Sequence, residues 1–166
     1  MTRRLVALLA AALLLVLTAA PTAAKGPPTH DFYEPEGLSF ADGEVCSFGV
    51  DFEVLRGRAH EQVRELADGT VHIRTTGVLI GRVTNTSTGE WLVRNFSGPA
   101  DFLIAPDGTA TARNRGHTIA WLIPAEGGPA LWHHRGTIHW SIDADGLFSI
   151  VRETGTREDL CALLAG

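Results

Sequence analysis

The chain has 166 residues, 45% of them hydrophobic, and is therefore long enough for one domain of ordinary size with a single core. Its 19 acidic side chains exceed its 14 basic ones, which gives a formal net charge of -5 at pH 7. An acidic chain without a basic run gains little free energy from releasing the counterions of phosphates. We therefore expect neither nucleic acids nor anionic membranes as partners.

The N-terminus has the layout of a secretory signal peptide. Arg3 and Arg4 precede an uncharged apolar run, residues 5–17, and the small residues Thr22 and Ala24 predict cleavage after residue 24. The apolar run of about 13 residues is too short to cross the roughly 30 Å hydrocarbon core of a bilayer as a helix. We expect a secreted, soluble protein that is not stably inserted in a membrane.

Two cysteines follow the predicted signal peptide, Cys46 and Cys161. An even number of cysteines in an oxidising compartment predicts a disulfide, which would join the first strand to the C-terminal segment. Closing so long a loop is worth roughly 4 to 5 kcal/mol in the chain-entropy treatment. A redox role is not expected, because such pairs normally have the Cys-x-x-Cys spacing.

Residues 25–43 contain several glycines and prolines and show no hydrophobic period, which predicts an extended N-terminal arm. A β domain, residues 44–166, is expected to follow. Within it, glycine-bearing pairs recur every 18 to 20 residues between segments rich in Val, Ile, Trp and Thr, and such pairs are hairpin signals. The pattern predicts an all-β antiparallel meander. The five predicted turns are Asp68-Gly69, Thr88-Gly89, Asp107-Gly108, Gly127-Gly128 and Asp145-Gly146.

A second glycine lies near the middle of four of these segments: Gly77, Gly98, Gly116 and Gly136. A straight strand of about 17 residues would exceed roughly 50 Å, too long for a domain of this size, so the strands must bend. Glycines tolerate such bends, and we expect the sheet to close into a small β-barrel or an orthogonal sandwich. Alternatively, each glycine marks a turn between about ten short strands, an interpretation favoured at the "NFSGPADF" segment.

Apolar pairing selects the length of the last hairpin loop. A three-residue loop, residues 144–146, pairs Ile142 with Phe148 and Trp140 with Ile150, whereas a two-residue loop pairs Ile142 with a serine. We therefore predict the three-residue loop. The "LADGT" and "APDGT" segments share a turn sequence and are expected to turn alike.

The C-terminus carries the 3.6-residue period of a helix. Thr156 is the predicted N-cap of a short helix over residues 157–165, with acidic residues in its first turn. Leu160, Leu163 and Leu164 would face the body of the domain.

The segment "LWHHRGTIHWSID", residues 131–143, has the alternation of a strand. One face would carry Leu131, His133, Arg135, Thr137, His139, Ser141 and Asp143. The predicted core face carries Trp132, His134, Ile138, Trp140 and Ile142.

This alternation argues against a metal site within the segment. His133 and His134 would point to opposite faces, and His133 and His139 would lie about 20 Å apart on one face. They cannot share an ion held at about 2.0 Å from each nitrogen. Ligands from other strands, such as His72 or His117, would be needed, and we expect neither a metal nor another cofactor.

Two constellations are candidates for binding. If Trp121 lies opposite Trp132, then His117, Trp121, Trp132 and His134 gather on one side, as in a small-molecule pocket with apolar walls and few polar groups. The alternative is a filled core with a hydrogen-bonded histidine.

The second constellation is cationic. Arg113 and Arg115 alternate along one predicted strand, and together with Arg135 and Arg94 they could bind an acidic ligand. The alternative is that these are ordinary solvated charges on a strand face.

The "VCSFGV" segment at 45–50 and the "EDLCALLA" segment at 158–165 carry a family resemblance. With the signal peptide and the Asp-Gly hairpins between them, they resemble a group of small exported proteins from high-GC Gram-positive bacteria. The resemblance covers essentially the mature domain. It implies a secreted β domain with one disulfide, and it implies no activity.

The residues favour binding over catalysis, since the sequence contains no Gly-x-Ser-x-Gly, His-Glu-x-x-His, phosphate-loop or Cys-His motif. We expect a secreted, non-catalytic domain that binds an extracellular macromolecule. The alternatives are a barrel pocket that carries a small apolar ligand, and a barrel enzyme of the dirigent or allene-oxide-cyclase type. In the enzyme, His134 would be the acid or base.

Overall fold

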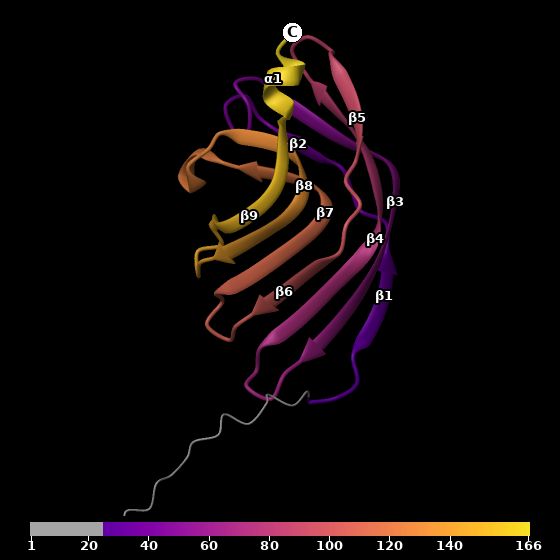
Figure 1. The fold of residues 1–166 in the computed structure, drawn as a ribbon, viewed down its shortest axis with the longest axis vertical. Helices are drawn as coiled ribbons and strands as arrows, with labels where there is room; N and C mark the ends of the chain where they lie inside the picture. Colours follow the sequence, from indigo (N-terminus) through magenta and orange to yellow (C-terminus); the bar gives the residue numbers. More distant parts are fainter. Residues whose placement is uncertain (1–24) are drawn as a thin grey trace, which may run out of the picture.

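The computed structural model describes residues 25–166 (Figure 1), and the predicted signal peptide lies outside them. The expected all-β antiparallel fold with a short C-terminal helix is confirmed, since 62% of the chain is strand and nine strands form one sheet. The strands are β1 Thr29–Tyr33, β2 Leu38–Phe40, β3 Val50–Glu65, β4 Val71–Asn85, β5 Trp91–Asn95, β6 Ala100–Ile104, β7 Ala110–Leu122, β8 Ala130–Ile142 and β9 Phe148–Asp159, and the helices are η1 Pro124–Glu126 and α1 Leu160–Leu164.

The strands follow the order β1-β3-β4-β6-β7-β8-β9, and β2 and β5 pair with β3 and β4. The five predicted turns all lie between consecutive strands. Within residues 25–43, the predicted N-terminal arm, Thr29–Tyr33 and Leu38–Phe40 are strands of the sheet, because β1 and β2 both pair with β3. None of the helices in residues 25–166 has the length and hydrophobicity needed to span a membrane.

Turn chemistry is as predicted. Trp140 pairs with Ile150 and Ile142 with Phe148, so the loop between β8 and β9 has the predicted register. The two x-Asp-Gly turns are alike: Leu66 N donates to the Thr70 carbonyl and Ala105 N donates to the Thr109 carbonyl, each with a distance of 2.8 Å. In both turns the aspartate side chain accepts from the backbone N–H two residues further on.

The long strands bend at glycines. Gly116 pairs with Gly136, which pairs with Gly155, so three glycines form a row across β7, β8 and β9. A Cβ atom on Gly136 would lie 2.0 Å from the Thr154 carbonyl oxygen, which only glycine avoids. The strands run on through Gly77 as well, and the alternative with more, shorter strands holds only at residues 96–99, between β5 and β6.

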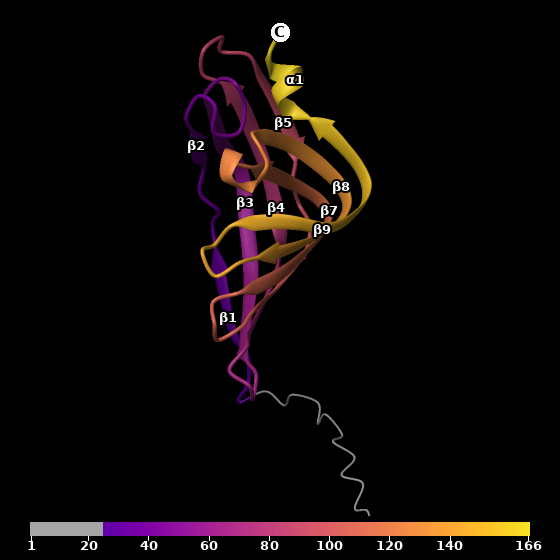
Figure 2. The same ribbon diagram turned by 90° about the vertical axis from the view of Figure 1, so that its left-hand side faces the viewer.

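The sheet curls but is not closed into a barrel. Figure 2 shows β7, β8 and β9 curving away from the long strands β3 and β4 and back towards them. Within this curl, formed by β7, β8 and β9, the rings of Trp132 and Trp140 have centroids only 6.3 Å apart, although the two residues are eight positions apart along β8. The Phe148 N–H, at the start of β9, donates to Glu126 of η1 over 2.9 Å, so the ends of the curl meet.

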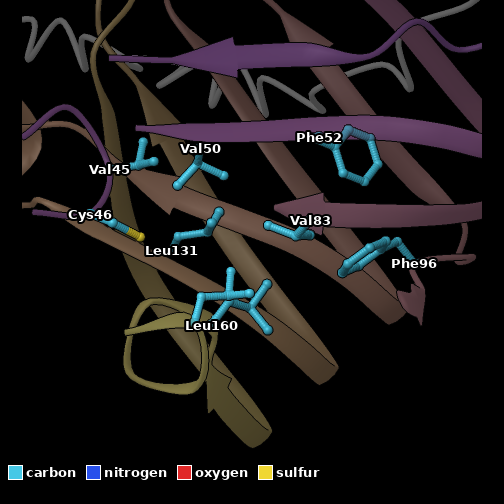
Figure 3. Close-up of a cluster of buried hydrophobic side chains, with 9 residues drawn as sticks. Val45, Cys46, Val50, Phe52, Val83, Phe96, Leu131 and Leu160 are labelled. Atoms are coloured by element: carbon cyan, nitrogen blue, oxygen red, sulfur yellow. The ribbon is translucent and has the colours of Figure 1, made fainter. Parts of the chain in front are cut away.

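Two cores lie on opposite faces of β8. The first fills the space between β3 and β4 on one side and β8 and α1 on the other (Figure 3). The second lies inside the curl, because Trp132 follows Leu131 and therefore points to the other face. The first core contains Val45, Cys46, Val50, Phe52, Val83, Phe96, Leu131, Leu160 and Leu164, and the second contains Ala112, Ala120, Trp132, Ile138 and Trp140.

The predicted disulfide between Cys46 and Cys161 is present, with a Cα–Cα distance of 5.5 Å. The C-terminal helix is shorter than predicted, because β9 continues to Asp159 and that residue, rather than Thr156, is the N-cap. Leu160 and Leu164 are buried as expected. Leu163 is 52% exposed, contrary to the prediction that it faces the body.

Candidate functional site

The structure divides the four predicted pocket residues between two faces. Trp121 pairs with Leu131 rather than with Trp132, because η1 occupies the connection between β7 and β8. A one-residue change of register moves every side chain to the other face. His117 and Trp121 therefore lie on the face opposite Trp132 and His134, and the predicted cluster does not form.

Trp132 and His134 are core residues inside the curl, 3% and 1% exposed. His134 Nε2 lies 3.1 Å from the Thr154 carbonyl oxygen, and the Arg157 guanidinium covers the Trp132 ring at 4.4 Å from its centroid. Because its ring is enclosed, His134 is poorly placed to exchange a proton with a substrate.

His117 and His133 are neighbours on the other face. His117 Nδ1 lies 3.1 Å from His133 Nε2, and His133 Nδ1 lies 3.3 Å from Glu158 of β9. Arg94 of β5 donates two hydrogen bonds to Glu158, of 2.7 and 2.9 Å. This network, His117-His133-Glu158-Arg94, joins β5 to the curl although these strands are not paired.

The pKa values of Glu158 and His133 are both lowered within this network. Hydrogen bonding from Arg94 lowers the pKa of Glu158 to about 2, and the hydrogen bond to His133 adds to this shift. Burial lowers the pKa of His133, against the opposing effect of Glu158. The network therefore holds a carboxylate beside a histidine that burial favours in its neutral form.

No group of three or more His, Cys, Asp or Glu side chains within residues 25–166 is arranged to hold a metal ion. The nitrogens of His117 and His133 are 3.1 Å apart, which is a hydrogen-bonding distance, and the Glu158 carboxylate is already bound by Arg94. We therefore interpret the network as a structural tie between β5 and β9.

A row of charged side chains crosses the outer face of the sheet, on the side away from the curl. Arg74 pairs with Asp101, Asp101 with Arg113, Arg113 with His139, and His139 with Arg152. Directly paired residues of antiparallel strands point to the same face. The row therefore runs over five neighbouring strands, about 19 Å at 4.8 Å per strand.

Asp101 is the acidic member of this face. Its carboxylate lies 2.9 Å from Arg115, 3.8 Å from Arg74 and 3.5 Å from His72. The ion pairs among residues 25–166 leave the other arginines of the face without a carboxylate. We define the cationic face as Arg64, Arg74, Arg113, Arg115, Arg135 and Arg152 with His72, His139 and Asp101.

A depression of about 440 Å³ lies on the cationic face. It is lined by the charged or polar residues His72, Asp101, Thr111, Arg113 and His139 and by the apolar residues Leu103, Ala112, Trp140 and Val151. Of the predicted residues, Arg113 lines this depression, and strand pairing places Arg115 and Arg135 on the same face. Arg94 is paired with Glu158 and lies elsewhere. Sequence reasoning missed Arg64, Arg74 and Arg152. Their period-two positions were visible, but the pairing that aligns them was not.

Comparison of the chain with models of protein families, with curated proteins and with solved structures found no match. The inference of function therefore depends on the geometry and chemistry of these residues.

Proposed function

We propose that this protein is a secreted, non-catalytic binding domain whose cationic face holds an acidic polysaccharide outside the cell. The observation that carries the proposal is a local excess of positive charge: the cationic face holds six arginines and one aspartate, in a chain with a net charge of -5, and Glu158 on the same side of the sheet is already bound by Arg94. Arginines gathered without carboxylate partners repel one another and attract anionic ligands. Guanidinium groups also pair with carboxylates and phosphates in two-pronged geometry.

Export is part of the proposal. The disulfide Cys46–Cys161 is typical of oxidising compartments outside the cytoplasm. The sequence of residues 1–24, in which two arginines precede an apolar run and small residues, supports the same location.

The side chains around the arginines favour a polysaccharide over other polyanions. Thr111, Thr137, Ser141 and Thr154 share the face and offer hydroxyl groups that can hydrogen-bond to sugars. Binding of single-stranded nucleic acid normally uses aromatic rings that stack on bases.

The test compares binding of polygalacturonate to the mature chain with binding to two matched double variants, by affinity electrophoresis. Arg113→Gln with Arg152→Gln removes two charges from the cationic face. Arg56→Gln with Arg82→Gln removes two charges that lie eight residues along β3 and β4 from Arg64 and Arg74, the members of the cationic face on those strands. We expect the first variant to bind at least about tenfold more weakly and the second to bind like the wild type within about threefold.

Equal weakening in both variants would contradict the proposal, because net charge alone would then explain binding. Equal binding of neutral dextran would contradict it as well. Tighter binding of duplex DNA than of polygalacturonate would assign the face to nucleic acid instead. Self-association that the first variant abolishes would assign it to a second copy of the chain.

A further inference from the structure

The inner face of the curl has a floor of small side chains. Apart from Leu122 at its end, the residues of β7 that point inward are Ala110, Ala112, Asn114, Thr118 and Ala120, on either side of Gly116. Ala112 lies opposite Trp140 and Ala120 opposite Trp132, so β8 supplies the bulk that β7 lacks. Small residues on one strand and an unclosed sheet leave space that the core does not fill.

This space is a pocket of about 200 Å³ whose lining is mostly apolar. The rings of Trp140 and Phe148 meet edge to face, with centroids 5.9 Å apart, and form one wall. Phe102, which pairs with Ala112, belongs to the opposite side. Six lining residues come from the inner face, namely Phe102, Asn114, Thr118, Ala120, Trp140 and Phe148, and the neighbouring Ile119 and Trp121 of β7 complete the lining.

Asn114 gives the pocket a hydrogen-bond donor. Its Oδ1 accepts from Trp140 Nε1 over 3.1 Å, and because an indole nitrogen can only donate, this contact fixes the orientation of the amide. The hydrogen bonds found within residues 25–166 do not use Nδ2 of Asn114. The NH2 group is therefore free to donate to a ligand in the pocket.

We propose that this pocket binds a small, flat apolar molecule of one or two rings that carries a hydrogen-bond acceptor, such as an aromatic ketone. The aromatic walls supply the apolar contacts, and Nδ2 of Asn114 donates to the carbonyl oxygen. The size is adequate, since an apolar cavity of about 150 Å³ already accepts benzene. The site is independent of the proposed polysaccharide binding, because it lies on the inner face and uses no residue of the cationic face.

The probe is acetophenone, and the readout is the indole N–H signal of Trp140 in a ¹H–¹⁵N spectrum of the mature, disulfide-bonded chain. That signal is assigned by its loss in Trp140→Phe. We expect acetophenone to shift the Trp140 signal in a saturable way and to leave that of Trp91, which is 60% exposed, unchanged. Ethylbenzene, which has a similar size but no acceptor, should bind about two- to tenfold more weakly.

Two variants test the hydrogen bond from Asn114 and the volume of the pocket separately. Asn114→Asp keeps an oxygen for Trp140 but removes the NH2 group, so it should remove the preference for acetophenone over ethylbenzene. Ala120→Phe should fill the pocket and abolish binding of both. Ala125→Phe makes the same change at an exposed position of η1 and should bind normally.

Several results would overturn this inference. One is the absence of a saturable Trp140 shift up to the solubility limit of acetophenone. Another is an unchanged preference in a folded Asn114→Asp variant. Normal binding by Ala120→Phe with a native-like spectrum would show that the ligand lies elsewhere.

Discussion

Gly155 shows how single residues set the curvature of this sheet. Its φ of 114° is in the region that favours glycine, and a Cβ atom would lie 2.1 Å from the Arg135 carbonyl oxygen. The partner of Gly155 is Gly136, so the close approach involves two backbones that cannot move apart without breaking their pairing. A side chain at this position would straighten the bend.

We predict that Gly155→Ala lowers the free energy of unfolding by about 2 to 3 kcal/mol, because it combines an unfavourable φ with a backbone clash. Urea denaturation followed by circular dichroism measures the change. Gly26→Ala, where a Cβ atom meets nothing within 4 Å, is the control and should be near neutral. Equal effects of the two substitutions would contradict this role of the bend.

Glu158 is the residue whose titration should affect stability most clearly. Its folded-state pKa of about 2 lies below the ordinary value of 4.5, so its stabilising contribution is present above about pH 4.5 and is lost as the pH falls towards 2. Its side chain is 39% exposed, which reduces the contribution to about 1 kcal/mol. The lowered pKa of His133 acts in the same direction, because burial disfavours its protonation as the pH falls.

We predict that Glu158→Gln lowers the free energy of unfolding at pH 7 by about 1 kcal/mol and flattens its pH dependence between pH 4.5 and 2. Thermal unfolding across this range provides the measurement. Glu90→Gln, at an exposed turn, should keep the wild-type pH profile. An unchanged profile in Glu158→Gln would show that the Arg94 contact does not act on stability.

At the scale of elements, α1 is a short helix whose position depends on its attachments. Five residues make too few hydrogen bonds to be stable alone, so α1 relies on the capping of Ala162 N by Asp159, on buried Leu160 and Leu164, and on the disulfide. The buried amide of Asn85 adds a hydrogen bond of 2.9 Å to the Leu164 carbonyl. These contacts attach the end of β9 to the first core.

Cutting the disulfide should therefore destabilise the whole domain. We predict that Cys46→Ser with Cys161→Ser lowers the free energy of unfolding by roughly 4 kcal/mol, since the bond constrains a separation of 115 residues. Thermal denaturation with and without a strong reductant is the simplest measurement. A melting temperature that reductant leaves unchanged would contradict this stabilising role.

The connections on either side of β8 show why one predicted strand register was right and the other was wrong. The loop after β8 could be predicted, because only one loop length pairs apolar residues with each other. The connection after β7 was not predicted, because Pro124 and Pro129 allow several loop lengths, although Pro124 at the first helical position and Gly127 at the C-cap are signals of the 3₁₀ turn. With the connection that the structure shows, Trp121 pairs with Leu131 instead of Trp132, and the predicted pocket residues therefore lie on two faces of the sheet.

At the scale of the whole molecule, the curl creates two faces with opposite chemistry. The inner row, Ile73-Phe102-Ala112-Trp140-Ile150, is apolar, and the outer row directly behind it contains three of the six arginines. The sequence predicts this alternation strand by strand. It does not predict the alignment of distant strands. A strongly cationic face could therefore not be predicted from a chain whose net charge is negative.

The measurement that tests the central proposal most directly is a calorimetric titration of the mature chain with polygalacturonate at low and high salt. The screening length falls from about 10 Å at 0.1 M salt to about 3 Å at 1 M, so contacts made by exposed arginines should weaken steeply. We predict saturable binding at low salt that is lost at 1 M. Absence of binding at low salt, or an affinity independent of salt, would contradict the assignment of the cationic face to an acidic polysaccharide.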